Sequence, residues 1–167
     1  MAEVFILLGG NVGDKAKIFE QTRKLIGERI GLITKMSSVY ITESWGFKSD
    51  PFWNQVLILN SSLNPFGILN LTQSIETGMG RSKKTRSNYA SSNYEDRVID
   101  IDLLFYDKLQ IDTPELTIPH PKIGERRFVL VPLNELEPDK YHPVLGLKIE
   151  ELLRICPDQL IVERLVK

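Results

Sequence analysis

The sequence predicts an α+β fold in which strands and helices follow the order β-α-β-β-α-β, with further elements added at the C-terminal end. Short apolar runs of strand length occur at residues 4–8 and 56–59. The segments that follow Asp14 and Asn64 repeat apolar residues at helical spacing. Residues 99–103 alternate apolar side chains with aspartates, which is typical of a strand with one polar face. This order of elements is the ferredoxin-like plan.

The composition is that of an ordinary globular protein. A length of 167 residues suits a single domain, residues 1–167, and the 42% hydrophobic and 26% charged residues are typical values. A net charge of −1 argues against a general nucleic-acid binder, which carries a basic excess. Cys156 is the only cysteine, which favours a reducing compartment. The apolar run at residues 4–8 is too short for a signal sequence or a membrane span. We therefore expect a cytoplasmic monomer that binds neither nucleic acid nor a membrane.

The first strand leads into a glycine-rich turn, Gly9-Gly10-Asn11-Val12-Gly13-Asp14. Asp14 is suited to cap a helix that ends near Gly27 or Gly31. The expected buried stripe of this helix comprises Ile18, Thr22, Leu25 and Ile26. Such a turn can bind phosphate. This one lacks the G-x-G-x-x-G spacing and the Walker lysine, so by itself it predicts only a turn.

Residues 32–42 and a segment around residues 56–59 are predicted to form the next two strands. Aromatic and amide side chains gather in and beside the loop between them: Trp45, Phe47, Phe52, Trp53, Asn54 and Gln55. Aromatic rings on a loop either fold back on the core or take up a flat ligand. Core burial is the commoner outcome, whereas Asn54 favours a planar heterocycle with hydrogen-bonding edges. Both alternatives stay open from the residues alone.

A second helix and a basic loop follow. Asn64 and Pro65 are typical of a helix start, and Gln73 and Glu76 lie near the expected end of the helix. Its expected buried stripe comprises Ile68, Leu69, Leu71, Thr72 and Ile75. The polar loop at residues 80–95 is long enough to be functional or disordered. Basic residues in and just after it are Arg81, Lys83, Lys84, Arg86 and Arg97.

Asp100 and Asp102 occupy alternate positions of the next strand, so both carboxylates lie on one face. The other face carries Ile99, Ile101 and Leu103. Paired carboxylates without a Cys or His cluster suit a hard cation such as magnesium, which completes its shell with water and substrate phosphates. Basic side chains beside such a pair are what phosphoryl transfer requires. The alternatives are an edge strand with an acidic outer face and a solvated basic loop.

The C-terminal additions begin with an extended, proline-containing segment at residues 116–121. An apolar run that opens at Arg126 favours a helix, which Pro132 is expected to disturb. A short helix is expected near residues 149–155 and a last strand at residues 160–162. Neither of the two histidines has a second ligand at metal spacing, so no zinc site is predicted.

Five sequence blocks occur in a characteristic order along nearly the whole chain. They are Gly9-Gly10-Asn11, Gly80-Arg81, Arg97-Val98-Ile99-Asp100-Ile101-Asp102, Pro119-His120-Pro121 and Arg126-Arg127-Phe128. In this combination they resemble the 6-hydroxymethyl-7,8-dihydropterin pyrophosphokinase family of folate biosynthesis. The resemblance implies magnesium-dependent transfer of the β,γ-pyrophosphoryl group of ATP to the hydroxymethyl oxygen of the pterin, with release of AMP.

The resemblance also implies a role for each matching residue. Two magnesium ions would be held by Asp100 and Asp102, and the catalytic set would comprise Arg81, Arg97, Asp100 and Asp102. Contacts to the nucleotide would come from Gln73, Glu76, His120 and Arg126. The pterin pocket would comprise Thr42, Phe52, Asn54 and Phe128. In that pocket Phe52 and Phe128 are the expected stacking faces, and Asn54 would read the ring edge.

The chain departs from the family pattern in the basic loop. The usual Trp-Gly-Pro-Arg turn is Tyr94-Glu95-Asp96-Arg97 here, Lys83 replaces a second loop arginine, and the loop is longer than in familiar members. We expect Tyr94 to replace the loop tryptophan as an aromatic side chain that covers the ligand.

Two other functions stay open at this point. A non-enzymatic ligand-sensing or RNA-contacting module could share the fold, because fold alone does not decide function. Such a module would not need paired aspartates beside a basic loop. Another nucleotide-dependent transferase, with a different acceptor, would share the metal and nucleotide residues and differ in the aromatic pocket.

Overall fold

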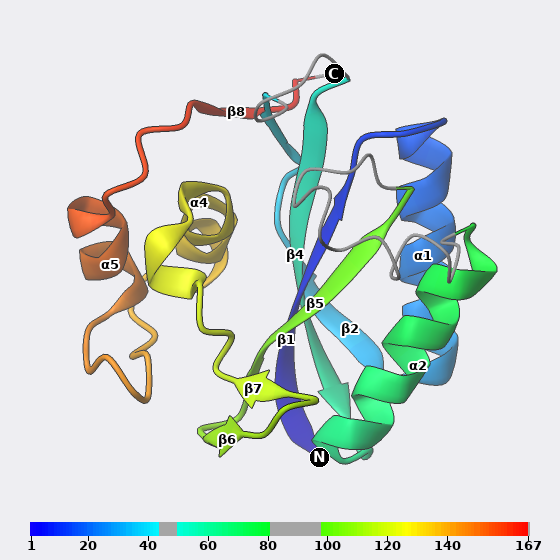
Figure 1. Ribbon diagram of the computed structural model, residues 1–167, viewed down its shortest axis with the longest axis horizontal. Coiled ribbons are helices and arrows are strands. Elements are labelled where there is room, and N and C mark those ends of the chain that lie inside the picture. The colour runs from blue at the N-terminus through cyan, green and yellow to red at the C-terminus, as the bar shows by residue number, and fades with distance from the viewer. Residues whose placement is uncertain (44–49, 81–97, 167) are drawn as a thin grey trace.

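A central sheet organises the computed structural model, which describes residues 1–43, 50–80 and 98–166 (Figure 1). Strand β1 (Ala2–Gly10) lies in the middle of this sheet. It pairs antiparallel with β4 (Phe52–Ser61) on one side and with β5 (Asp100–Tyr106) on the other. The long apolar run of β1 is buried on both faces, as expected for a central strand.

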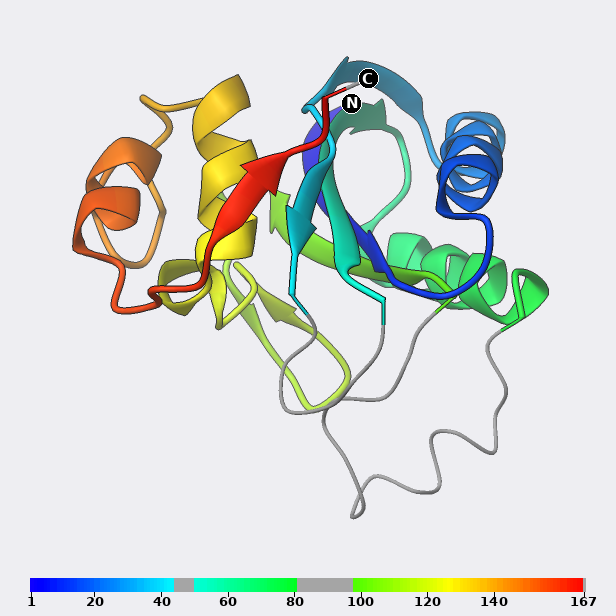
Figure 2. The same ribbon diagram turned by 90° about the horizontal axis from the view of Figure 1, so that it is seen from above.

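The sheet has the ferredoxin-like strand order, extended at one edge. The order is β5-β1-β4-β3-β8, and β2 also pairs with β4. Strands β2 (Leu32–Met36) and β3 (Tyr40–Thr42) lie along β4 one after the other. Strand β8 (Val162–Arg164) comes from the C-terminal end of the chain and pairs with β3 (Figure 2, red).

The single second strand predicted for residues 32–42 was wrong, because the chain breaks between β2 and β3. Ser37 explains the break: its N–H donates to the Val56 carbonyl at 2.9 Å, and its hydroxyl oxygen accepts from the Val56 N–H at 2.9 Å. The Gln55 amide donates to the Ser37 carbonyl at 2.8 Å. Side chains therefore replace part of the strand ladder at this point.

Helices α1 (Lys15–Arg29) and α2 (Pro65–Gly78) cover one face of the sheet (Figures 1 and 2). Both predicted caps are confirmed: the Asp14 carboxylate accepts from the Lys17 N–H at 3.3 Å, and Asn64 accepts from the Gly67 N–H at 2.8 Å. The core beneath them includes Val4, Ile6, Leu8, Ile26, Leu57, Leu59, Ile68, Ile75, Ile99, Ile101 and Leu103.

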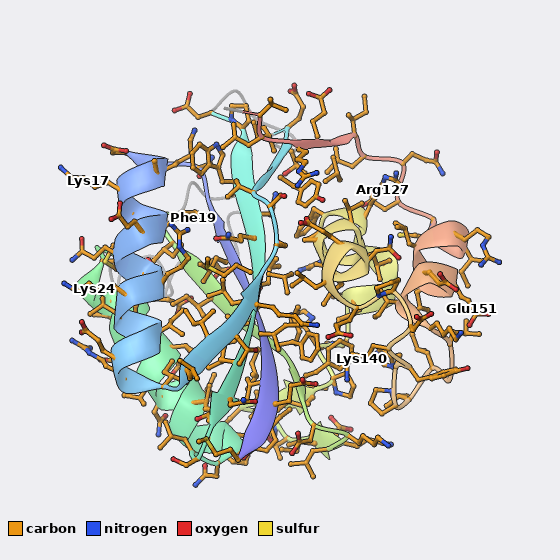
Figure 3. The ribbon with its side chains drawn as sticks, turned by 180° about the vertical axis from the view of Figure 1, so that it is seen from behind. Lys17, Phe19, Lys24, Arg127, Lys140 and Glu151 are labelled. Carbon is orange, nitrogen blue, oxygen red and sulfur yellow. The ribbon has the colours of Figure 1, made fainter. Side chains whose placement is uncertain are left out.

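The stripe predicted for α1 omitted Phe19, which is buried at 1% exposure. Figure 3 shows Phe19 directed from α1 toward the sheet. Its ring meets the ring of Trp53 edge to face, with the centroids 5.8 Å apart. Thr22 and Ile26 are buried as expected, while Ile18 and Leu25 are only partly buried. The buried stripe is therefore rotated toward Trp53.

Helices α4 (Arg127–Leu136) and α5 (Ile149–Ile155) form a third layer on the other face (Figures 1 and 3). Pro132 lies inside α4 and is buried. The helix nevertheless continues to Leu136, so the disturbance expected at Pro132 does not interrupt it. Between the sheet and these helices lies a second core that includes Phe5, Leu7, Val56, Ile58, Phe105, Val129, Leu130, Leu133 and Leu152. The central sheet is thus sandwiched between two helical layers.

Short elements complete the fold. Strands β6 (Ile111–Asp112) and β7 (Thr117–Ile118) form a separate two-stranded sheet, and the 3-10 helix η1 (Ile123–Glu125) precedes α4. The last strand was predicted at residues 160–162 but forms at residues 162–164, because pairing with β3 sets its register. Within the described ranges, no helix is long and apolar enough to cross a membrane.

Candidate active site

The two aspartates of β5 lie on the face of the sheet that is turned toward α4 and α5. Ile99, Ile101 and Leu103 are buried on the opposite face, under α1 and α2, as the alternation predicted. Asp100 and Asp102 are half-buried. Alternate strand residues are separated by roughly 7 Å along the chain. Their carboxylates can therefore reach one ion or two neighbouring ions.

A row of paired residues runs across the sheet from the aspartates. Asp100 pairs with Gly9, Gly9 with Asn54, and Asn54 with Tyr40, so all four lie on the same face. Gly9 carries no side chain, and a Cβ placed there would lie 3.8 Å from the side-chain amide oxygen of Asn54. Two strand spacings separate Asp100 from Asn54, which is about 10 Å. Because Gly9 has no side chain, none projects from β1 between the Asp100 carboxylate and the Asn54 amide.

Asn54 and Thr42 form a buried polar pair at the far end of this row. The Asn54 amide nitrogen donates to the Thr42 hydroxyl at 3.1 Å and to the Tyr40 carbonyl at 3.4 Å. Asn54 is 3% exposed and Thr42 is 4% exposed. Phe52 precedes Asn54 by two residues and is half-buried on the same face. The structure thus brings together three of the residues predicted to form the pterin pocket.

Helix α4 lies beside the strands that carry these three residues. It packs beside β3 and β4 and begins immediately after Arg126. Phe128, in its first turn, is half-buried, and the Arg126 guanidinium lies 5.8 Å from the centre of the Phe128 ring. Phe128, predicted to stack on the pterin, and Arg126, predicted to contact the nucleotide, therefore lie side by side at the start of α4.

His120 lies between the aspartates and α4. Its ring Nδ1 accepts from the Lys122 backbone N–H at 3.1 Å, and its backbone N–H donates to the Leu104 carbonyl at 3.0 Å. Burial, together with the nearby charge of Arg126, lowers the pKa of His120 to about 4, although Asp100 acts in the opposite direction. At neutral pH the ring is uncharged and holds its proton on Nε2, so it can donate one hydrogen bond to a ligand.

Glu76 and Gln73 lie in the last turns of α2, beside the edge strand β5. Glu76 is 4% exposed, and its carboxylate accepts from the Ile101 N–H at 2.8 Å. This bond ties α2 to the strand that carries the aspartates, a role that the sequence did not reveal. Gln73 is half-buried on the same helix.

The aromatic cluster that the sequence placed near residue 50 divides between the two faces. Trp53 belongs to the α1 side, where it packs on Phe19 and lies 5.9 Å below the Lys15 ammonium group. Phe52 lies on the α4 side. Core burial therefore applies to Trp53, whereas the uptake of a flat ligand by Phe52 stays a prediction.

Several predicted residues lie outside the part of the chain that the structure describes. They are Trp45, Phe47, Arg81, Lys83, Lys84, Arg86, Tyr94 and Arg97. Their predicted roles stay predictions.

The donor chemistry of the aspartate pair fits magnesium. Magnesium is commonly bound in proteins by one or two carboxylates, with phosphate oxygens and water completing the shell. Asp100 and Asp102 supply two such carboxylates, and both are half-buried. Among the described residues, no group of three or more His, Cys, Asp or Glu side chains is placed to hold one ion.

Comparison with known proteins gives one consistent answer. The model of the 7,8-dihydro-6-hydroxymethylpterin-pyrophosphokinase family matches residues 5–138. The 2-amino-4-hydroxy-6-hydroxymethyldihydropteridine pyrophosphokinase of Porphyromonas gingivalis is 39% identical over 140 residues, which cover 83% of this chain and 92% of the relative. The Bacillus subtilis protein of the same name is 37% identical over 134 residues, covering 79% of this chain and 76% of the relative.

Solved structures agree on the fold. The wild-type HPPK-DHPS of Plasmodium falciparum with pteroate superposes with a TM-score of 0.72 at 17% identity, covering 92% of this chain. This chain spans 42% of the length of that protein. A second HPPK-DHPS structure, a triple mutant with STZ-DHP, superposes with a TM-score of 0.73 and 17% identity over 92% of this chain and 43% of that one.

Proposed function

This chain belongs to the 7,8-dihydro-6-hydroxymethylpterin-pyrophosphokinase family, and from that premise we propose how its residues carry out the reaction. The enzyme transfers a pyrophosphoryl group to 6-hydroxymethyl-7,8-dihydropterin in folate biosynthesis. We take ATP as the donor and magnesium as the required metal. The hydroxymethyl oxygen attacks the β-phosphorus, the bond to the α-phosphate oxygen breaks, AMP leaves, and the hydroxyl proton is released.

The row of paired residues from Asp100 across Gly9 to Asn54 carries this proposal. On one face, about two strand spacings apart, lie the Asp100 carboxylate, which would bind metal, and the Asn54 amide, which would read the ring edge. A flat pterin held at Asn54 can extend its hydroxymethyl group over Gly9 toward Asp100. The enzyme then works mainly by positioning the two substrates and neutralising phosphate charge.

Asp100 and Asp102 would hold two magnesium ions, which supply charge neutralisation of the ATP phosphates and orientation of the attacking hydroxyl. Positive side chains at Arg81 and Arg97 would stabilise the polyphosphate from the basic loop. These two arginines lie outside the described residues, so the family resemblance alone supports their role.

The nucleotide side would be formed by Gln73, Glu76, His120 and Arg126. His120 is suited to donate from Nε2 to a phosphate or ribose oxygen, since its Nδ1 already accepts from Lys122. Its lowered pKa keeps the ring neutral, so Arg126 supplies the positive charge. Glu76 would contribute by holding the backbone of β5 in place, since its carboxylate already accepts from the Ile101 N–H.

The pterin would lie between the rings of Phe52 and Phe128, with Asn54 and Thr42 at its polar edge. Both rings are half-buried, which leaves surface for a stacked heterocycle. The Asn54 amide nitrogen already donates to Thr42 and Tyr40, so its amide oxygen would accept from the ring edge. A ring without a donor at that position would leave this oxygen without a partner and would bind less well. Tyr94 would cover the ligand from the loop. All these residues come from one chain, so a single-domain monomer suffices.

The test is AMP release from ATP by the purified protein, with and without 6-hydroxymethyl-7,8-dihydropterin. We expect AMP only when both the pterin and magnesium are present, and no AMP after chelation of the metal. Formation of ADP, or AMP release without the pterin, would contradict the proposed reaction. Turnover that survives complete removal of divalent cations would contradict the metal assignment.

A further inference from the structure

Glu135, in the last turn of α4, contacts the strand that carries Thr42. Its Oε1 accepts from the Tyr40 phenol at 2.7 Å and from the Ser38 N–H at 3.0 Å. Its Oε2 accepts from the Ser38 hydroxyl at 3.1 Å. The Arg164 guanidinium of β8 approaches the same carboxylate at 3.9 Å. One carboxylate therefore joins α4 to Ser38 before β3, to the first residue of β3, and to the C-terminal strand β8.

The contacts occur where the sheet is interrupted. Strand β3 contains only three residues, and the break before it removes regular ladder bonds around Ser38. The Glu135 carboxylate accepts the Ser38 N–H in place of a strand partner. A hydrogen bond to a charged acceptor is stronger than a neutral one. Glu135 thus compensates for the weak attachment of a short strand.

Tyr40 connects this contact to the proposed pterin pocket. Its phenol meets Glu135, while its backbone carbonyl accepts from the Asn54 amide, which also donates to Thr42. Tyr40 is 8% exposed, so its ring is enclosed on all sides. Burial and the hydrogen bond to Glu135 raise the pKa of Tyr40 to about 12, so the phenol keeps its proton. A shift of Tyr40 would change the orientation of the Asn54 amide.

The same helix also carries the opposite wall of the pocket. Phe128 lies in the first turn of α4, and Glu135 follows seven residues later, about 10 Å along the axis and on nearly the same side of the helix. Helix α4 therefore connects the Phe128 ring to Glu135, whose carboxylate holds Ser38 and Tyr40. Helix α4 thus sets the distance between Phe128 on one side of the proposed pocket and Thr42 and Asn54 on the other.

We propose that Glu135 is a positioning residue of the pterin pocket: by holding Tyr40 and Ser38 it fixes Asn54 and Thr42 at a set distance from Phe128. This inference rests on the proposed pterin site. It assigns Glu135 no contact with substrate and no part in the chemical step. The residues proposed to bind the nucleotide and the metal lie on β5, α2 and the segment before α4, and none of them contacts Glu135, Tyr40 or Ser38 through the hydrogen bonds described above.

The first experiment is E135Q, assayed by AMP release with the pterin and ATP varied in turn. The amide lacks the negative charge and replaces one accepting oxygen by an NH2 group, so the hydrogen bonds to Ser38 and Tyr40 weaken, and we expect KM for the pterin to rise about tenfold. KM for ATP should stay within about twofold of the wild-type value, because the interaction lost is a pterin-side one. An unchanged pterin KM, or an equal rise in both constants, would overturn the proposal.

E137Q is the matched control. Glu137 directly follows the same helix, has a similar side-chain exposure (31% against 28% for Glu135), and pairs with Lys35 at 2.8 Å. Lys35 belongs to β2, which carries none of the proposed pterin residues. We expect both KM values of E137Q to match those of the wild type. A rise in pterin KM as large as that of E135Q would show a general effect of loosening α4 and contradict the specific role.

Y40F provides a milder test that does not depend on how well E135Q folds. It removes only the phenol contact, and we expect a rise of about threefold in pterin KM. In the E135Q background the same change should have no further effect, because the two groups act through one contact. Additive effects would contradict the proposal. If the wild type releases AMP only with the pterin but these variants behave normally, the positioning role fails while the enzymatic function stands.

Discussion

The two faces of the central sheet differ in how they use their residues. The face toward α1 and α2 is mostly apolar, and its buried hydrophobic side chains belong to one continuous core. One exception is buried Gln55, which accepts from Arg23 of α1 at 2.9 Å. The face toward α4 and α5 is apolar only at one end. At its other end it carries polar residues, namely Thr42, Asn54, Asp100 and Asp102. One face thus stabilises the fold, and the other combines a smaller core with the candidate active site.

Strand β5 shows this difference within a few residues. Ile101 and Leu103 are each 6% exposed on the core face, while Asp100 and Asp102 are half-buried on the other. Because side chains alternate along a strand, neighbouring residues can have unrelated roles. Mutations of adjacent residues should therefore affect either activity or stability, and the predictions below test that separation.

The largest effect is expected for D102A. Loss of a proposed metal-binding carboxylate should lower kcat by about a thousandfold. The melting temperature should stay close to that of the wild type, since Asp102 is not part of either apolar core. The measurement is AMP release at saturating magnesium, together with thermal unfolding. D112A, at an exposed position of β6, is the control and should be fully active. A near-normal rate for D102A would refute the assignment.

The next effect is expected for L103A, one residue away on the opposite face. Removing this buried side chain should lower the free energy of unfolding by about 3 kcal/mol. Both KM values of the folded protein should be unchanged, because Leu103 faces α1 and α2. Urea unfolding and steady-state kinetics measure the two quantities. Altered substrate affinity without loss of stability would show that the two faces are not separate.

A smaller effect is expected for F128L, which removes a proposed stacking ring but keeps an apolar side chain. Pterin KM should rise about tenfold, a typical effect of losing an aromatic surface that stacks on a base. KM for ATP should change little. F66L, at a 41% exposed position of α2, is the control and should behave as the wild type. Normal pterin affinity in F128L would exclude Phe128 as a stacking face.

The smallest effect concerns acid stability, which we trace in part to the layer of α4 and α5. Burial lowers the pKa of His142 below its ordinary value of 6.5, and its Nδ1 accepts from the N–H groups of Val144 and Leu145. As the pH falls below 6.5, the unfolded chain binds a proton at this residue that the folded chain does not. Its contribution to stability is therefore present above pH 6.5 and is lost at lower pH.

H142N keeps a side-chain acceptor but cannot titrate. Urea unfolding between pH 7.5 and pH 5, values that bracket the ordinary pKa, should show a smaller loss of stability in H142N than in the wild type. An equal loss in both proteins would mean that His142 does not contribute. Enzymatic activity at pH 7.5 should be the same in both.

Much of the fold could be predicted from the sequence because its signals are local. The caps at Asp14 and Asn64, the alternation at residues 99–103 and the short helix at residues 149–155 are all confirmed. The errors lie where distant segments intervene. Strand β8 shifted by two residues to pair with β3, and the predicted strand at residues 32–42 was broken by contacts from Gln55, Val56 and Glu135.

The candidate site shows the same division. The sequence by itself determined which residue types are present and on which side of a strand each lies, since periodicity and family-like blocks are properties of the chain order. Only the tertiary structure decided that Gly9 separates Asp100 from Asn54, that Glu76 caps the edge of β5, and that Glu135 holds Tyr40 across 95 residues of sequence. The physical reason is that a side chain's face follows from local backbone geometry, whereas its partner depends on how remote elements pack together.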